Sequence, residues 1–100
     1  MIIYVDIDHT ICTYREDTLE YSKAIPLHDR IKKINDLYDQ GNEIVYWTAR
    51  GTVTGIDWRE LTELQFLDWG VKYHKLRFGK PAYDLFVDDK NINSEEFFKE

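Results

Sequence analysis

Apolar residues gather into short runs along this chain, and the spacing within each run indicates an element type. Residues 2–5 (IIYV) are an unbroken apolar run at the start, and residues 43–49 (EIVYWTA) form a second run that ends in Thr48. Continuous runs of this length are typical of strands buried on both faces, as in parallel sheets. Shorter runs at 75–78 and 83–87 predict two more strands.

Two longer segments show a helical period instead. In residues 26–41 the apolar positions recur three and four residues apart, which predicts a helix that opens at Pro26 and ends at Gly41. Residues 57–69 predict a second helix with a broader apolar face, ended by Gly70. The stripe of the first helix consists of Leu27, Ile31, Ile34, Leu37 and Tyr38.

The remaining segments complete a pattern of alternating strands and helices. Residues 11–25 have mixed polarity and no period, which predicts an exposed hairpin or flap, and a short helix beginning at Asn93 or Ser94 ends the chain. Alternation of this kind makes a mainly parallel sheet with right-handed crossovers. We therefore expect one α/β domain over residues 1–100, a Rossmann-like three-layer sandwich of about four strands.

Composition narrows the class of protein. At 100 residues and 43% hydrophobic the chain can bury one core, and its net charge of −6 argues against non-specific binding of nucleic acid, which needs Lys and Arg. The single cysteine, Cys12, fits a reducing compartment. The apolar run at 2–5 is too short for a membrane span or a signal peptide. These features predict a soluble cytoplasmic protein with no membrane partner.

Polar residues that could take part in catalysis or ligand binding follow the predicted strands. Asp6 and Asp8 come directly after the first strand and point the same way if the strand continues that far. Thr48 ends the second strand and Lys80 precedes the last. Each of these is ordinary alone, as a capping or turn residue or a solvated lysine. Because the carboxyl ends of parallel strands share one edge, where α/β sheets bind ligands, we expect them to converge there with Asp88 and Asp89, which follow the last strand.

In this order the motifs DIDHT, IVYWT, GKP and LFVDD resemble those of the haloacid dehalogenase-like phosphohydrolases, from Ile2 to Asp89. The resemblance implies that Asp6 is the nucleophile forming an aspartyl-phosphate. Asp8 is then general acid and base, and its backbone carbonyl touches the metal. Phosphoryl oxygens are held by Thr48 and Lys80. The implied metal is Mg²⁺, which prefers oxygen ligands, and its predicted ligands are Asp6, Asp8, Asp88 and Asp89.

Charge counting suggests where a proton resides. Three carboxylates, Asp6, Asp88 and Asp89, carry −3, which Mg²⁺ and Lys80 balance with +3. The site is then neutral only if Asp8 is protonated, the state that a leaving-group acid requires.

The sequence does not decide the roles of three nearby residues. Arg50 follows Thr48-Ala49 and is interpreted either as a ligand of a phosphate or of a substrate carboxylate, or as a member of a structural ion pair. His9 stands where many family members carry Gly, and we interpret it as an imidazole pointing into solvent. Trp58 lies near the open edge of the sheet.

The resulting hypothesis is a Mg²⁺-dependent phosphatase that hydrolyses a phosphomonoester, a sugar phosphate or small alcohol phosphate. The GKPAYDLFVDD segment looks like small family members associated with polysaccharide and sugar-nucleotide biosynthesis. A phospho-acceptor domain of the receiver type is an alternative, although receivers place the accepting Asp on an internal strand. A catalytically silent binding module is the third.

The chain has no room for a cap domain, so it resembles the small capless branch of the family. A flap of about fifteen residues cannot enclose a substrate alone. We therefore expect either a large substrate or a homo-oligomer in which a neighbouring subunit covers the site, and we favour the oligomer. Aromatic anchors for that contact are Tyr14, Tyr21 and Trp58.

Overall fold

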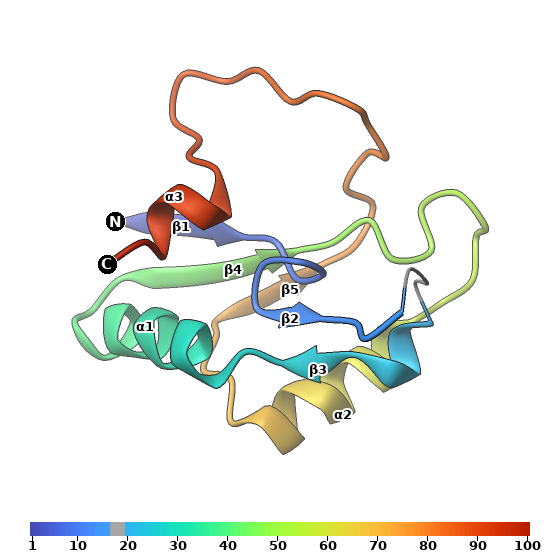
Figure 1. Ribbon diagram of the computed structural model, residues 1–100, viewed down its shortest axis with the longest axis horizontal. Helices are drawn as coiled ribbons and strands as arrows, with labels where there is room; N and C mark the ends of the chain where they lie inside the picture. Colours follow the sequence, from blue (N-terminus) through green and yellow to red (C-terminus); the bar gives the residue numbers. More distant parts are fainter. Residues whose placement is uncertain (17–19) are drawn as a thin grey trace.

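Three parallel strands form the centre of the fold in the computed structural model of the chain, which describes residues 1–16 and 20–100. Strand β1 (Ile2–Val5) pairs with β4 (Glu43–Trp47), and β4 pairs with β5 (Lys75–Arg77). The strand order is β1-β4-β5 (Figure 1). The prediction of a parallel α/β sheet is therefore confirmed for three of its four strands.

Two long helices and a short one accompany the sheet: α1 (His28–Asp39), α2 (Arg59–Trp69) and α3 (Ser94–Phe97). Gly70 ends α2 in the left-handed conformation, with φ of 70°, as the sequence predicted. The predicted start of the first helix at Pro26 is wrong, because Pro26 lies in a strand. Across the described ranges, no helix is both long and apolar enough to cross a membrane.

The predicted flap at 11–25 contains a short antiparallel pair, β2 (Cys12–Thr13) with β3 (Ile25–Pro26), and the 3-10 helix η1 (Tyr21–Lys23). Residues 17–19 of this flap lie outside the described residues. The base of the flap is not exposed, since Ile11 and Cys12 are fully buried in the core. Apolar packing of these two residues therefore anchors the flap to the core.

The core occupies one face of the sheet. Ile44 and Tyr46 point to this face, and the ring of Tyr46 meets that of Phe66 in α2 edge-on, with centroids 4.9 Å apart. Buried residues from both long helices belong to the same cluster, so the predicted three-layer sandwich is here a two-layer arrangement. Because strand side chains alternate, Tyr4 and Trp47 lie on the other face, where Tyr4 is 53% exposed.

The fourth predicted strand, at 83–87, is absent from this structure. Residues 81–93 instead leave the body after Lys80 and return at α3 as a wide excursion (Figure 1). The side chains of Leu85 and Val87 are 79% and 86% exposed. The sequence signal for a strand is present, but a strand forms only where a partner edge supplies hydrogen bonds.

Gly51 and Gly55 offer a matched test of the loop that follows β4. Both have positive φ, 80° and 76°, but a Cβ at Gly51 collides with the carbonyl oxygen of Ile56, whereas a Cβ at Gly55 meets nothing. We expect Gly55→Ala to cost about 1 kcal/mol of unfolding free energy through backbone strain. Gly51→Ala should cost about 1–3 kcal/mol more, through overpacking. Denaturant unfolding of both variants measures this, and equal losses would contradict the close approach.

Candidate functional site

Asp6 and Lys80 meet at the carboxyl end of the sheet. Lys80 Nζ lies 3.5 Å from Asp6 Oδ1, and the exposed fractions of the two side chains are 14% and 36%. The backbone N–H of Lys80 donates to the carbonyl of Thr48, 3.1 Å away, which fixes the loop after β5 against the end of β4. The predicted convergence of Asp6, Thr48 and Lys80 is thereby confirmed.

The surroundings of Asp6 disfavour its charged form. Burial raises the pKa of Asp6 above its ordinary value of 3.8; the charge of Lys80 and a hydrogen bond from the backbone of Ile7 offset part of this, and the charge of Asp8 adds to it. A carboxylate held this way is less stabilised than a solvated one, and therefore more ready to form a bond with an electrophile.

Asp8 is held by the guanidinium group of Arg50 in a two-pronged pair. Arg50 Nε donates to Asp8 Oδ2 at 3.0 Å and Arg50 Nη2 donates to Asp8 Oδ1 at 2.9 Å. The Arg50 side chain is fully buried and that of Asp8 is 17% exposed. Such bidentate pairs fix orientation as well as charge.

The remaining donors of Arg50 reach into α2. Nη1 donates to the hydroxyl of Thr62 at 3.0 Å and to Oε1 of Gln65 at 2.6 Å. Gln65 in turn donates from Nε2 to the carbonyl of Tyr21 in the flap, 2.6 Å away, and the Tyr21 ring lies 4.8 Å from the guanidinium carbon. One buried arginine therefore joins the end of β1, the helix α2 and the flap.

This network changes the expected charge of Asp8. Burial alone favours the neutral acid, but hydrogen bonds and charge from Arg50, with bonds from Tyr14 and Cys12, hold the pKa of Asp8 below its usual value of 3.8. Asp8 is therefore ionised near neutral pH. The prediction of a proton on Asp8 is wrong for this arrangement, because it counted Lys80 and a metal as the only cations and omitted Arg50.

Two flap residues complete the setting of Asp8. The Tyr14 hydroxyl donates to Asp8 Oδ1 at 2.5 Å, and the Cys12 thiol contacts the same oxygen at 3.5 Å. Burial, with the neighbouring carboxylate, raises the pKa of the Cys12 thiol to about 12 and also raises the pKa of Tyr14. Both groups keep their protons at neutral pH and act as donors.

Arg50 and Thr48, two of the expected phosphate ligands, make contacts within the protein instead. Arg50 was one candidate, but its guanidinium is turned inward and occupied by Asp8, Thr62 and Gln65, so the structural ion pair is the correct alternative. The hydroxyl of Thr48 accepts from the backbone N–H of Arg50 at 3.1 Å, and Thr48 is 1% exposed. Its hydroxyl thus stabilises the turn that aims Arg50.

The acidic pair does not join the site. Asp88 and Asp89 are exposed, and the backbone N–H of Asp89 donates to Asp88 Oδ1 at 2.9 Å. Among residues 1–16 and 20–100, no three His, Cys, Asp or Glu side chains lie together as a metal site would require. A single chain therefore does not bring Asp6, Asp8, Asp88 and Asp89 together, because the segment that carries the last two does not pair with β1, and the shared metal site stays a prediction.

The backbone explains the departure at His9. Its φ of 62° is in the left-handed region, which glycine adopts without strain and other residues seldom adopt. The imidazole is exposed, as expected, and lies 5.5 Å from the ring of Tyr14. Trp58 packs edge-on against Tyr21, 5.2 Å away, and so supports the flap.

Sequence reasoning missed the polar partners of Asp8 and Arg50. Tyr14 was interpreted as an exposed aromatic, and Thr62 and Gln65 were not singled out. The usable signal was weak: Thr62 and Gln65 are three residues apart on a helix, so they share a face. Nothing in the flap sequence distinguishes Tyr14 from Tyr21 as the donor.

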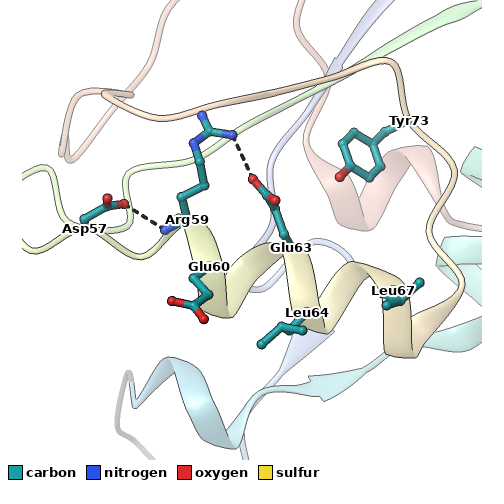
Figure 2. A pocket seen from close by; sticks show the side chains of 7 residues that line it. All are labelled: Asp57, Arg59, Glu60, Glu63, Leu64, Leu67 and Tyr73. Atoms are coloured by element: carbon teal, nitrogen blue, oxygen red, sulfur yellow. Dashed lines mark hydrogen bonds and ion pairs between the residues drawn. The ribbon is translucent and has the colours of Figure 1, made fainter.

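A surface groove of about 580 Å³ lies elsewhere, along α2 (Figure 2). The ion pair of Arg59 with Glu63 crosses its wall, and Leu64 and Leu67 line it lower down (Figure 2). It contains none of the predicted site residues. The chemistry is therefore not organised around this hollow, and the candidate site remains the carboxyl edge of the sheet.

The Arg50–Asp8 pair gives a prediction for stability. Arg50→Met leaves a largely buried carboxylate without its cation, and we expect a loss of about 3 kcal/mol in unfolding free energy at pH 7. Because Asp8 has a lowered pKa only when folded beside Arg50, its stabilisation exists above pH 3.8 and is lost as the pH falls. The difference between variant and wild type should shrink at acidic pH.

Lys32→Met is the matched control, since Lys32 pairs with Asp36 at 2.9 Å on the exposed face of α1. Surface pairs of this kind contribute little, so the control should leave stability nearly unchanged. Urea unfolding of both variants at several pH values decides the matter. A pH-independent loss for Arg50→Met would mean that the arginine acts through packing alone.

Comparison with known proteins adds information on the fold. No family model matches the chain, and no curated protein matches it. A crystal structure of an MCSG structural-genomics target from Vibrio cholerae is similar, with a TM-score of 0.86 and 24% sequence identity, over 99% of this chain and 88% of that chain. This likeness shows that the present chain shares its fold with that protein.

Proposed function

We propose that this chain is a phosphomonoester hydrolase that works through an aspartyl-phosphate on Asp6. The observation that carries the proposal is the ion pair of Asp6 with Lys80 at the carboxyl edge of the sheet, beside the ionised Asp8. A nucleophilic carboxylate needs a cation within reach to admit a dianionic phosphate, and Lys80 supplies one. The substrate class is a sugar phosphate or small alcohol phosphate.

In the first step an oxygen of Asp6 bonds to phosphorus and the bond from phosphorus to the leaving oxygen breaks. Lys80 offsets the negative charge of the phosphoryl oxygens as they pass the carboxylate. The leaving alkoxide takes a proton from Asp8 in its carboxylic acid form and departs as the alcohol, which leaves Asp8 ionised for the second step. Because the pKa of Asp6 is raised, its carboxylate exchanges an unfavourable charge for a covalent bond.

The second step returns the enzyme to its starting state. A water molecule attacks phosphorus, the bond between phosphorus and Asp6 breaks, and inorganic phosphate leaves. Asp8 is ionised beside Arg50, so in this arrangement it is ready to take the proton from that water. To protonate the leaving group first, Asp8 must gain a proton against the field of Arg50, which makes the first step more demanding for poor leaving groups.

The resemblance of the motifs to the haloacid dehalogenase-like family also implies Mg²⁺. The ligand set does not fit within one described chain, because Asp88 and Asp89 are not gathered with Asp6. We therefore derive both steps from the chain's own residues. The assay below includes Mg²⁺ and, in parallel, a chelator.

Asp6→Asn is the direct test of the nucleophile. The amide keeps shape but cannot form the phospho-enzyme, so we expect turnover of an aryl phosphate to fall by at least about 10³-fold. Asp36→Asn, an exposed carboxylate of α1, is the control and should keep wild-type activity. Continuous release of phosphate by wild type supports hydrolysis, whereas a single stoichiometric phosphorylation would show a phospho-acceptor domain instead.

The pH dependence should report Asp6. Activity needs the ionised carboxylate, so kcat/KM should fall as pH drops through a pKa above 3.8. Because the Lys80 charge lowers this pKa, Lys80→Met should move the acid limb to higher pH, in addition to lowering the rate. Lys80→Arg keeps the charge and should leave the limb near its original position. An unmoved limb in Lys80→Met would separate Lys80 from the titration of Asp6.

A further inference from the structure

Within the part of the chain that the structure describes, the outer edge of β1 has no partner strand in the sheet. In the order β1-β4-β5, β1 pairs with β4 on one side, and no strand of the described residues pairs with the other. Two of its side chains are largely exposed, Ile2 at 67% and Tyr4 at 53%. An exposed apolar edge with unpaired N–H and C=O groups at one side is a template for another strand.

A strand-like segment of the same chain is equally unsatisfied. Residues 81–93, which we call the arm, leave the body of the molecule as a wide excursion (Figure 1), and four of their apolar side chains are exposed. β-branched and aromatic residues of this kind favour strands, and exposed runs of them mark interaction sites. The run consists of Tyr83, Leu85, Phe86 and Val87, exposed by 47%, 79%, 42% and 86%.

Both ends of the arm are fixed to the body. At its start, Lys80 donates to the carbonyl of Thr48, and the hydroxyl of Thr52 donates to the carbonyl of Lys80 at 2.7 Å. At its end, Glu95 in α3 pairs with Arg30 in α1 at 3.0 Å. The middle of the arm is therefore held away from the body by two anchored ends.

The arm cannot complete its own sheet in the register that the site requires. To bring Asp88 level with Asp6 in a parallel pairing, Asp84 must lie level with Ile2, at the amino end of β1. Ile2 is level with Glu43, five residues before Thr48 along β4. Since residues advance about 3.3 Å and strands lie about 4.8 Å apart, that position is about 17 Å back and about 10 Å sideways from Thr48.

The chain from Lys80 is too short for that path. The direct distance is about 20 Å, and four residues from Lys80 to Asp84 span at most about 14 Å when fully extended. Lys80 is held at the level of Thr48 by its backbone hydrogen bond. The arm of a second copy has no such tether to this body and meets no such limit.

We propose that two copies exchange arms: residues 83–87 of each chain add as a parallel fourth strand to the free edge of β1 of the other. The partner's arm then delivers its acidic pair, at positions 88 and 89, beside Asp6 and Asp8. Exchange of identical segments gives a closed two-fold dimer with the same contact made twice. The exchange is inferred only from the unpaired edge of β1 and the exposed arm, whereas the role of the acidic pair in the site rests on the proposed function.

The proposal explains two observations together. The acidic pair that a single chain fails to gather is completed by the second copy. The exposed Ile2 and Tyr4, beside the half-buried Trp47 on the open face of the sheet, gain an apolar neighbour in Phe86 of the other chain, which lies level with Tyr4 and points to the same face. Each site is then built from two chains.

Sedimentation velocity of the wild-type chain at micromolar concentration should show a dimer. The double variant Leu85→Asp/Val87→Asp places charges inside the added strand, and we expect it to sediment as a folded monomer. Leu64→Asp/Leu67→Asp, on the exposed face of α2, is the matched control and should remain a dimer. A wild-type monomer, or a dimer that survives the arm variant, overturns the exchange.

Cross-linking tests the register without reference to activity. In the proposed pairing Phe86 of one chain lies level with Tyr4 of the other. Mixing the Tyr4→Cys chain with the Phe86→Cys chain and oxidising with diamide should give a disulfide-linked heterodimer by mass spectrometry. The native Cys12 is fully buried, and wild type serves as its control. A double-cysteine chain that links within one monomer shows instead that the arm pairs with its own β1.

Mixed variants test whether the site is shared. The Asp6→Asn chain has an intact arm, and the Asp88→Asn/Asp89→Asn chain has an intact nucleophile, so each alone should be inactive. After mixing, random pairing makes half of the dimers mixed, each with one complete site, and about a quarter of wild-type activity should return. No recovery, with the cross-linked dimer formed, refutes the shared site. An inactive wild type refutes the proposed function, and sedimentation and cross-linking still decide the exchange.

Discussion

The buried pair of Arg50 with Asp8 is the interaction on which the rest of the site depends. A buried guanidinium is stable only when its donors find acceptors, and here those acceptors come from the end of β1 and from α2. The turn formed by Thr48 aims the arginine, and the ring of Tyr21 covers it. The segment after β1, the helix α2 and the flap therefore all contact one buried side chain.

That constraint also separates the two carboxylates of the site. Asp6 sits where burial outweighs the help of Lys80, so its pKa is raised, while Asp8 sits on Arg50 and its pKa is lowered. Carboxylates two residues apart in the segment that follows β1 thus acquire opposite pKa shifts from their neighbours rather than from their residue type. Such divergence is how one fold obtains a nucleophile and a base from the same residue type.

The pattern of apolar residues was sufficient to predict those helices and strands that are determined by residues close in sequence. The apolar runs gave β1 and β4, the stripe of α1 matched its buried residues Ile31 and Ile34, and Gly70 ended α2. The prediction of a strand at 83–87 was wrong, because a strand needs a free sheet edge within reach. The spacing of apolar residues carries no information on where such an edge lies. Arg50 was equally ambiguous, since a sequence does not say whether a guanidinium turns toward solvent or toward a carboxylate across 42 positions.

The same reasoning links the incomplete sheet to the incomplete site. A three-stranded sheet with an unpaired β1 edge and a partly exposed face can hold Asp6 and Asp8 but leaves the arm unpaired. In an exchanged dimer the fourth strand and the remaining acids arrive together, so assembly of the fold and of the active centre becomes a single event. The fraction of complete sites then follows protein concentration, because a lone chain lacks both the edge partner and the acids.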